Sequence, residues 1–297
     1  MKLLVMAAVL VACSGKSDLP VPTQADKTAL VNEACPMVTG AYFFEVSKDG
    51  RTSHILGTRH ISVGLFKFPD VVGKTLDAAS LLVEEIAPGT KEKPTFKSEP
   101  LREELGPKDW AHFEELVTPP VAKRMEKMQG IVAALILIAM YEDLTVFLDK
   151  QIEERAAQTK IPGAGLESSG FQMELLAKLL DVRLVKALVE ETPNRAKLRQ
   201  ATHDGIERYC KGTEKEAEVV DGVEEQQMLA HGFTKADLDK IQEDLLYTRN
   251  ADWIPKLEKI FEQDKVFVAV GAGHLQGPRG VIELLKQRGY TVHRITN

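Results

Sequence analysis

The chain has 297 residues, of which 44% are hydrophobic and 28% are charged, and its formal net charge is −6. This composition is typical of a globular protein that is long enough to bury a sizeable core, in one large domain or two smaller ones. No basic stripe interrupts the acidic balance, so nucleic acid is excluded as an expected partner, because binding to phosphates needs clustered Lys and Arg.

The first residues are predicted to be an export signal rather than part of the fold. Lys2 precedes an apolar run over residues 3–11, which is too short to span a bilayer. The sequence LVAC at residues 10–13 resembles a bacterial lipobox, so we expect removal of residues 1–12 and lipidation of Cys13. No Asp stands directly after the cysteine, which by resemblance to the sorting pattern of Gram-negative lipoproteins favours the outer membrane. An ordinary secretory signal with an incidental cysteine is the alternative.

The stretch after the anchor is predicted to be a tether. Residues 13–34 are mostly polar and contain two prolines, and a single domain is expected over residues 35–297. Cys35 and Cys210 are candidates for one disulfide in an oxidising compartment. Such a bond would constrain the unfolded chain by about 5 kcal/mol. Two unpaired thiols are the alternative.

The domain is predicted to open with a β-hairpin. Residues 41–45 and 52–56 have the pattern of strands, and the Asp-Gly pair at 49–50 is a strong turn signal. Helical periodicity follows over residues 70–79, and residues 81–86 have the pattern of a buried strand. This order of strand, turn, helix and strand is typical of a βαβ-like unit.

Residues 101–261 are predicted to be almost entirely helical and are punctuated by prolines. Within them, residues 131–140 are all apolar, which we interpret as a buried core helix, with a wall of a substrate cleft as the alternative. A strand at 266–270, a helix at 280–288 and a strand from residue 289 complete the chain. The predicted fold class is α/β, with a central sheet built from N- and C-terminal βαβ-like segments and a large helical insertion.

One short signature occurs twice, each time after a predicted strand. It is GTRH at residues 57–60 and GAGH at residues 271–274. Sites of α/β proteins form outside the carboxyl ends of their strands. We therefore expect His60 and His274 to meet there, although they are far apart in the sequence. Two imidazoles and a carboxylate suit a divalent cation such as zinc, manganese, iron or cobalt.

Two acidic residues, Glu84 and Glu85, stand at the end of the buried strand and are the candidate carboxylates, with a solvated strand end as the alternative. The pair Gly271-x-Gly273 lacks the third glycine and the acidic residue of a dinucleotide site. Five histidines lack partner patterns and are interpreted as surface or structural residues: His54, His112, His203, His231 and His293.

Several motifs together resemble the TraB/PrgY/GumN family, relatives of the Tiki proteases. They are GTRH at 57–60 with Pro69 and Glu85, GLES at 165–168 with Gln172, RNADW at 249–253, VGAGHL at 270–275 and RGYTV at 288–292. The similarity extends from about residue 36 to the end of the chain. It implies a divalent-metal-dependent hydrolase that acts on peptides, with His60, Glu85 and His274 as metal ligands. Glu84 and Arg59 stand where the family usually has apolar residues, which leaves open which carboxylate faces the metal.

The same resemblance brings four further residues toward the site. Arg249 could polarise the scissile carbonyl or bind a substrate carboxylate, or it could form a structural ion pair with Glu167 or another acid. Asn250 could support catalysis by donating a hydrogen bond, or it could cap a helix. Glu167 and Gln172 are candidates for binding substrate or for capping the helix that begins beside them.

The predicted function is a divalent-metal-dependent hydrolase, a metallopeptidase by resemblance, anchored by lipid to the bacterial cell envelope. The expected partners are a peptide substrate and the membrane. Two alternatives remain open. The first is a lipoprotein that sequesters a peptide or another ligand without turnover. The second is a metal-dependent esterase, because a metal-activated water does not discriminate between carbonyls.

Overall fold

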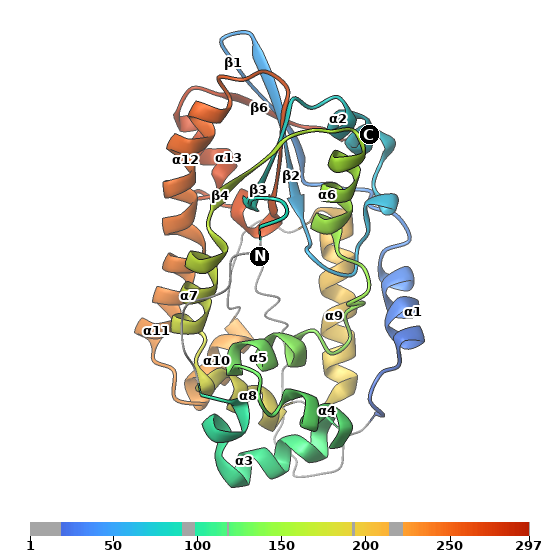
Figure 1. Ribbon diagram of the computed structural model, residues 1–297, viewed down its shortest axis with the longest axis vertical. Coiled ribbons are helices and arrows are strands. Elements are labelled where there is room, and N and C mark those ends of the chain that lie inside the picture. Colours follow the sequence, from blue (N-terminus) through green and yellow to red (C-terminus); the bar gives the residue numbers. More distant parts are fainter. Residues whose placement is uncertain (1–18, 91–98, 118, 192–193, 214–221, 297) are drawn as a thin grey trace.

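The computed structural model describes residues 19–90, 99–117, 119–191, 194–213 and 222–296 (Figure 1). The predicted signal peptide and Cys13 lie outside these residues. Within them the α/β fold is confirmed, with a six-stranded sheet in the order β4-β3-β5-β2-β1-β6. The strands are β1 (Phe43–Lys48), β2 (Arg51–Thr58), β3 (Leu81–Ile86), β4 (Gly163–Glu167), β5 (Val266–Gly271) and β6 (Thr291–Arg294).

The helices surround the sheet and fill the predicted insertion. They are α1 (Gln24–Ala34), η1 (Leu65–Lys67), α2 (Asp70–Asp77), α3 (Leu101–Val117), α4 (Pro119–Met125), α5 (Gly130–Ile138), α6 (Leu148–Gln158), α7 (Ser169–Leu179), α8 (Val182–Glu191), α9 (Arg195–Lys211), α10 (Gly222–Ala230), α11 (Lys235–Gln242), η2 (Glu243–Tyr247), α12 (Thr248–Ile260), η3 (Ala272–Leu275) and α13 (Val281–Gln287). Helices α12 and α13 lie on one side of the sheet and α2 and α6 on the other, while α3, α4, α5, α8 and α10 gather at the far end of the molecule (Figure 1).

The sheet interleaves the two ends of the chain. Strands β4, β3, β5 and β2 run parallel, and β5 lies between β3 and β2. Strand β1 pairs antiparallel with both β2 and β6. The β1–β2 hairpin closes through Asp49 and Gly50, whose φ angles of 51° and 76° are those of a two-residue turn that matches the twist of the strands. Four parallel strands therefore present their carboxyl ends at one edge.

The prediction that residues 101–261 are almost entirely helical is wrong at β4, which extends the sheet by pairing with β3. The strand GAGLE has few of the β-branched residues that usually mark strands. Its glycines are required by close packing. A Cβ on Gly165 would lie 2.3 Å from the backbone nitrogen of Ala87, and one on Gly163 would lie 2.6 Å from the ring of Pro88.

The predicted tether over residues 13–34 is wrong in its second half, because α1 is part of the folded domain. Thr23 and Asp26 form a capping box at its start, and the buried Leu30 and Val31 lie on its inner side. The helix packs against α9, and directly after it Cys35 forms a disulfide with Cys210. The pairing that the sequence left open therefore fastens the start of the domain to the insertion.

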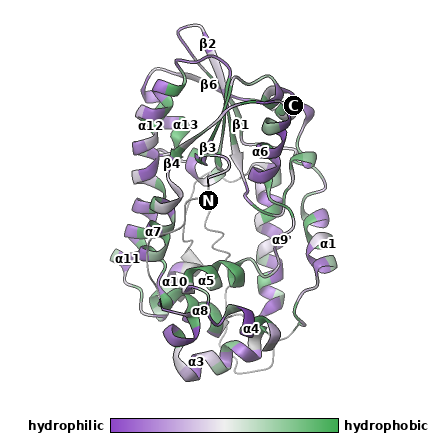
Figure 2. Ribbon diagram, in the orientation of Figure 1, coloured by the Kyte–Doolittle hydropathy of each residue, from purple (hydrophilic) through white to green (hydrophobic). Residues whose placement is uncertain are grey.

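The apolar run at residues 131–140 forms most of α5, which packs against α3 and α8 and is almost wholly apolar (Figure 2). Its Ile131, Ala134 and Leu137 are buried in the core, and the cavity beside His60 is lined by other elements. The structure thus agrees with the core interpretation. Among the described residues, no helix combines the length and the apolar character needed to cross a bilayer.

Candidate functional site

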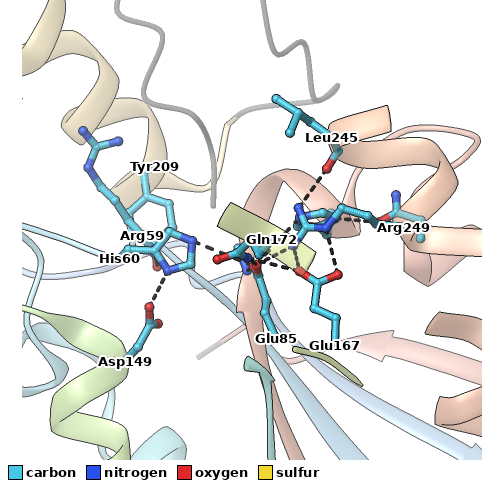
Figure 3. A network of polar contacts seen from close by, with 12 residues as sticks. Arg59, His60, Glu85, Asp149, Glu167, Gln172, Tyr209, Leu245 and Arg249 are labelled. Carbon is cyan, nitrogen blue, oxygen red and sulfur yellow. Dashed lines mark hydrogen bonds and ion pairs between the residues drawn. The ribbon is translucent and has the colours of Figure 1, made fainter. Parts of the chain in front are cut away.

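The candidate site lies where the four parallel strands end (Figure 3). His60 follows β2, Glu85 is near the end of β3, Glu167 closes β4, and His274 lies in η3 directly after β5. Because parallel strands end at one edge of the sheet, these side chains come together from four separate stretches of the sequence. The predicted meeting of the two Gly-x-x-His signatures is what the structure shows.

The turn that carries His60 is held by tight packing and by one tyrosine. A Cβ on Gly57 would lie 2.8 Å from the Cβ of Tyr42 and 3.0 Å from the Cα of Ala272, so the two signature turns approach too closely for any other residue. The hydroxyl of Tyr209, on α9, donates to the carbonyl of Gly57 at 2.8 Å and accepts from the backbone N–H of Arg59 at 3.1 Å. A buried ion pair with Glu142 compensates the Arg59 charge.

Tyr209→Phe should lower the free energy of unfolding by about 1–3 kcal/mol, because it leaves a buried carbonyl and a buried N–H of the His60 turn without their partner. Urea denaturation followed by circular dichroism measures the change. Tyr290→Phe, at the far end of the sheet, is the matched control. An unchanged unfolding midpoint in Tyr209→Phe would show that the hydroxyl does not hold the turn.

The orientation of His60 is set by Asp149 of α6. The Nδ1 atom of His60 makes a short hydrogen bond with a carboxylate oxygen of Asp149, which can only accept, so Nδ1 carries the proton. The Nε2 atom is buried, has no hydrogen-bond partner among the described residues, and points toward Glu85 (Figure 3). A carboxylate that orients an imidazole in this way is the usual partner of a metal-binding histidine.

His274 is fully buried and is oriented by Asn250 of α12. Its Nδ1 lies 2.6 Å from Oδ1 of Asn250, and the amide nitrogen of Asn250 donates to the carbonyl of Arg279 at 3.0 Å. The amide orientation is therefore fixed, so Nδ1 of His274 carries the proton and the electron pair of Nε2 accepts from Nη1 of Arg249 at 3.1 Å. The ring packs on Trp253 with 4.4 Å between the ring centroids.

Both Nε2 atoms face the same oxygen of Glu85. The separation from Oε1 is 3.9 Å for His60 and 3.8 Å for His274. Burial alone would raise the pKa of the Glu85 carboxyl, but nearby positive charge, to which the Arg249 guanidinium contributes, holds that pKa well below 4.5. Burial lowers the pKa of His274 well below 6.5 against the opposing attraction of Glu85. The pair is thus an anionic carboxylate and a neutral imidazole.

Arg249 forms the structural ion pair that was one of its two predicted roles. Its Nε and Nη2 donate to the Glu167 carboxylate at 3.0 and 2.6 Å, and Nη2 also donates to Oε2 of Glu85 at 2.8 Å. Nη1 donates to the carbonyl of Leu245 at 2.9 Å and lies 3.1 Å from Nε2 of His274. The guanidinium is engaged within the protein, which supports the ion-pair role over direct contact with substrate.

The capping alternatives for three residues are wrong. Ser168 caps α7 by accepting from the N–H of Phe171, and Asn250 lies inside α12 rather than at its start. Gln172 instead donates to Oε2 of Glu85 at 2.8 Å and to Oε1 of Glu167 at 3.2 Å. The three residues therefore brace the site, since Glu167 and Gln172 hold the Arg249–Glu85 pair and Asn250 holds His274.

The two adjacent acids of β3 take different roles because successive side chains of a strand point to opposite faces. Glu85 turns toward Arg249 of α12, whereas Glu84 turns toward Asp149 and Glu153 of α6. Glu84 lines a cavity of about 440 Å³ together with His60 and these acids. Burial and the neighbouring carboxylates raise the pKa of Glu84 to about 9. Glu85 is therefore the carboxylate that faces both histidines.

Glu84→Gln should flatten the pH dependence of stability in metal-free protein. Between pH 4.5 and about 9 the folded Glu84 holds a proton that the unfolded chain has released. The free energy of unfolding of the wild type should therefore fall as the pH rises, by up to about 1.4 kcal/mol per pH unit. Urea titrations at about pH 5 and about pH 8.5 test this. Glu114→Gln, at an exposed position, should keep the wild-type slope, and an equal slope in Glu84→Gln would contradict the assignment.

The donor set fits a divalent cation in its chemistry. Two imidazole Nε2 atoms and one carboxylate oxygen are common zinc, manganese and iron ligands, and the buried Nε2 of His60 has no hydrogen-bond partner in the part of the chain that the structure describes. Among the described residues, no group of three or more His, Cys, Asp or Glu side chains is placed so that it could hold a metal ion. The separations of 3.8 and 3.9 Å around Glu85 describe an open set of donors.

Sequence reasoning missed the residues that α6 and α9 bring to the site. Asp149 and Glu153 belong to a polar helix whose acids resemble those of any solvated surface, and Tyr209 carries no motif of its own. For Asp149 and Glu153 the sequence did offer a signal, because their spacing of four residues places both on one face of α6. The five histidines interpreted as surface or structural residues line neither the site nor its cavity.

One family model matches the chain, that of the TraB/PrgY/gumN family, over residues 42–294. No curated protein and no solved structure matches it. The matched region includes both Gly-x-x-His turns, Glu85 and the Arg249–Glu167 pair, which are the residues that the fold brings to one edge of the sheet. The chain therefore belongs to the TraB/PrgY/gumN family.

Proposed function

We propose that the protein is a divalent-metal-dependent hydrolase that cleaves peptides at the edge of its sheet. The observation that carries the proposal is the convergence of three electron-pair donors, in which the Nε2 atoms of His60 and His274 lie 3.9 and 3.8 Å from Oε1 of Glu85. Two imidazole nitrogens and a carboxylate oxygen that converge in this way are suited to share one divalent cation. The orientation of both rings by Nδ1 hydrogen bonds supports the same conclusion.

A divalent cation at these donors would supply Lewis-acid catalysis, polarising a substrate carbonyl and making water more acidic. The rest of the site consists of groups that hold the donors in place. Asp149 and Asn250 fix the two imidazoles, and the backbone N–H of Gly271 donates to Oε1 of Glu85 at 2.9 Å. If Nε2 of His274 bound a cation, it could no longer accept from Nη1 of Arg249. Nη1 would still donate to the carbonyl of Leu245, which lies 2.9 Å from it.

The substrate class and the location are the finer parts of the proposal. Peptide cleavage is what the resemblance to the Tiki relatives of this family implies, and the cavity beside His60, of about 440 Å³, supports it by being large enough for a side chain of a bound peptide. Attachment to the cell envelope is supported by the lipobox-like sequence ending at Cys13. The Cys35–Cys210 disulfide suits the same oxidising compartment.

The test is metal analysis of the purified protein followed by cleavage of a peptide library with the metal restored. Chelation should abolish cleavage, and Mn²⁺, Zn²⁺, Co²⁺ or Fe²⁺ added singly should restore it. His60→Ala and His274→Ala should be inactive but folded, while His112→Ala, which replaces an exposed histidine of the insertion, should retain activity. Cleavage that survives chelation would contradict the proposal. Peptide binding without cleavage would support the sequestering alternative, and turnover of activated esters alone would support the esterase.

A further inference from the structure

Strand β4 forms one edge of the sheet and has an open side. It pairs with β3, has no second neighbour among the described strands, and crosses in front of the other strands in Figure 1. The backbone N–H and C=O groups of successive strand residues alternate between the two sides of the strand. The N–H of Leu82 donates to the carbonyl of Pro162 at 2.9 Å, so Pro162 and Ala164 are turned toward β3. Gly163 and Gly165 therefore direct their N–H and C=O groups away from the sheet.

These outward groups are accessible. Gly163 and Gly165 are exposed, and no residue outside the sheet forms a backbone hydrogen bond with them in the described part of the chain. They also lack side chains that could shield the backbone, since the turn after β3 fills the space that a Cβ would need. Natural edge strands often exclude another strand with Lys, Pro or a bulge, but both outward positions here are glycines. The open stretch ends at Leu166, whose carbonyl accepts from Nζ of Lys256 at 2.6 Å.

The open edge leads into the candidate site. Two residues past the second glycine, β4 ends at Glu167, and Gln172 in the first turn of α7 donates to Glu85 at 2.8 Å. The turn that packs on the two glycines also lines the cavity of about 440 Å³ beside His60. The other edge strand, β6, is separated from β2 by β1. Of the two sheet edges, the edge of β4 is therefore the one that continues into the site.

We propose that a substrate peptide binds by adding a strand to this edge, with its backbone paired to Gly163 and Gly165 and its scissile bond beyond Glu167. This rests on the proposed function, since it takes the ligand to be a peptide. An extended peptide presents N–H and C=O groups at the spacing of a strand, which is the complement that the open edge lacks. The substrate class is thus an extended segment, and helical or folded segments are excluded because their backbone groups are already paired.

The spacing of strands indicates where the paired part of the peptide lies relative to the scissile bond. Neighbouring strands are about 4.8 Å apart, so the added peptide lies about 10 Å from β3, the strand that carries Glu85. Each residue of an extended chain spans about 3.3 Å. The peptide must therefore continue for about three residues from the paired segment to reach Glu85. The paired residues lie on one side of the scissile bond.

The test measures binding of singly N-methylated peptides to the full-length His60→Ala variant, which should not consume them. The parent peptide is the library member that this variant binds most tightly by fluorescence anisotropy. N-methylation removes one N–H donor and blocks close approach of the backbone at that residue. We expect Kd to rise at least about tenfold at two peptide residues separated by one residue, and to change less than about twofold at the residue between them.

Hydrogen exchange of the same variant, followed by NMR, measures pairing at the edge itself. A saturating concentration of the parent peptide should slow exchange of the Gly163 and Gly165 N–H groups at least about tenfold, because both become hydrogen-bonded. The N–H of Gly50 is the matched control, since it is in the β1–β2 turn at the other end of the sheet. Its exchange should be unchanged.

The outcomes separate this inference from the proposed function. Losses of affinity with a period of two residues, together with protection of both glycines, would support edge pairing. Losses without that period, unprotected glycines, or a library without a binder would overturn it. A parent peptide that shows the periodic losses but is not cleaved by the wild type would contradict the hydrolase and leave the edge pairing in place. Cleavage of a peptide that leaves both glycines unprotected would do the reverse.

Discussion

Replacing Glu85 by Gln should lower kcat/KM for a cleaved peptide by about 10²–10⁴-fold. Its Oε1 atom lies 3.9 Å from Nε2 of His60 and 3.8 Å from Nε2 of His274. It also accepts from three donors, namely the N–H of Gly271, Gln172 and Arg249. A carboxamide removes the negative charge and replaces one carboxylate oxygen with an NH₂ group, which can only donate. That NH₂ group must then face another donor, either the N–H of Gly271 or the guanidinium of Arg249.

The measurement compares steady-state kinetics of the wild type and Glu85→Gln on one peptide identified from the library, with metal content determined for both. Glu45→Gln is the matched control because Glu45 is also a strand residue but is part of the β1–β2 hairpin, outside the site. Activity of Glu85→Gln within a few-fold of the wild type would show that Glu85 is not a functional carboxylate, whatever the metal content.

Arg249→Met should lower the free energy of unfolding by about 3–5 kcal/mol, which is the usual cost of removing one partner of a buried ion pair. Arg249 is only 3% exposed, and it compensates two acids, Glu85 and Glu167, whose side chains are 8% and 5% exposed. Methionine fills much of the volume but leaves both carboxylates without their cation. The loss of the contact with Trp253, whose ring centroid lies 4.9 Å from the guanidinium carbon, adds to the cost.

The pH dependence of this effect has a definite sign. The pKa of Glu85 in the folded protein is held well below 4.5. The stabilisation that this provides is therefore present above about pH 4.5 and is lost as the pH falls through the folded pKa. The difference between wild type and Arg249→Met should accordingly be largest near neutral pH and should shrink on acidification. An effect that grows toward low pH would contradict the assigned ion pair.

Arg279→Met provides a matched control for the stability measurement. Arg279 makes the same kind of two-pronged ion pair with Glu243, at 2.6 and 2.7 Å, but both partners are about half exposed. Exposed ion pairs contribute about 0–1 kcal/mol. Urea denaturation of both variants thus isolates burial as the cause. Equal losses in the two variants would mean that the compensation of Glu85 and Glu167 is not what makes Arg249 important.

The part of the site built on strand ends could be predicted from the sequence. The strand pattern before each Gly-x-x-His turn, together with the rule that parallel strands end at one edge, placed His60 and His274 together without any knowledge of the strand order. The end of β3 offered Glu84 and Glu85 as candidate carboxylates, and the family resemblance favoured Glu85. Choosing Glu85 over Glu84 required the structure, because alternation alone shows that the two residues face opposite sides and not which helix lies on each side.

The parts built on helices could not be predicted, because nothing local distinguishes them. Asp149 and Tyr209 act through distant packing of α6 and α9 against the strands, and sequence periodicity does not tell which helix faces which strand end. The strand β4 was missed because glycines reduce its strand propensity, although those glycines permit its close approach to the residues after β3. The helix α1 was missed because its polar residues outweigh the three apolar residues that it buries.

The position of β5 between β3 and β2 means that synthesis must be nearly complete before these elements can associate. Residues Val266–Gly271 must leave the ribosome before the strand that precedes His60 and the strand that carries Glu85 have a common neighbour. Contacts of such long sequence separation form slowly. A nascent or prematurely terminated chain that lacks β5 therefore has no candidate site, and the fold itself delays assembly of the site until the residues of β5 have been synthesised.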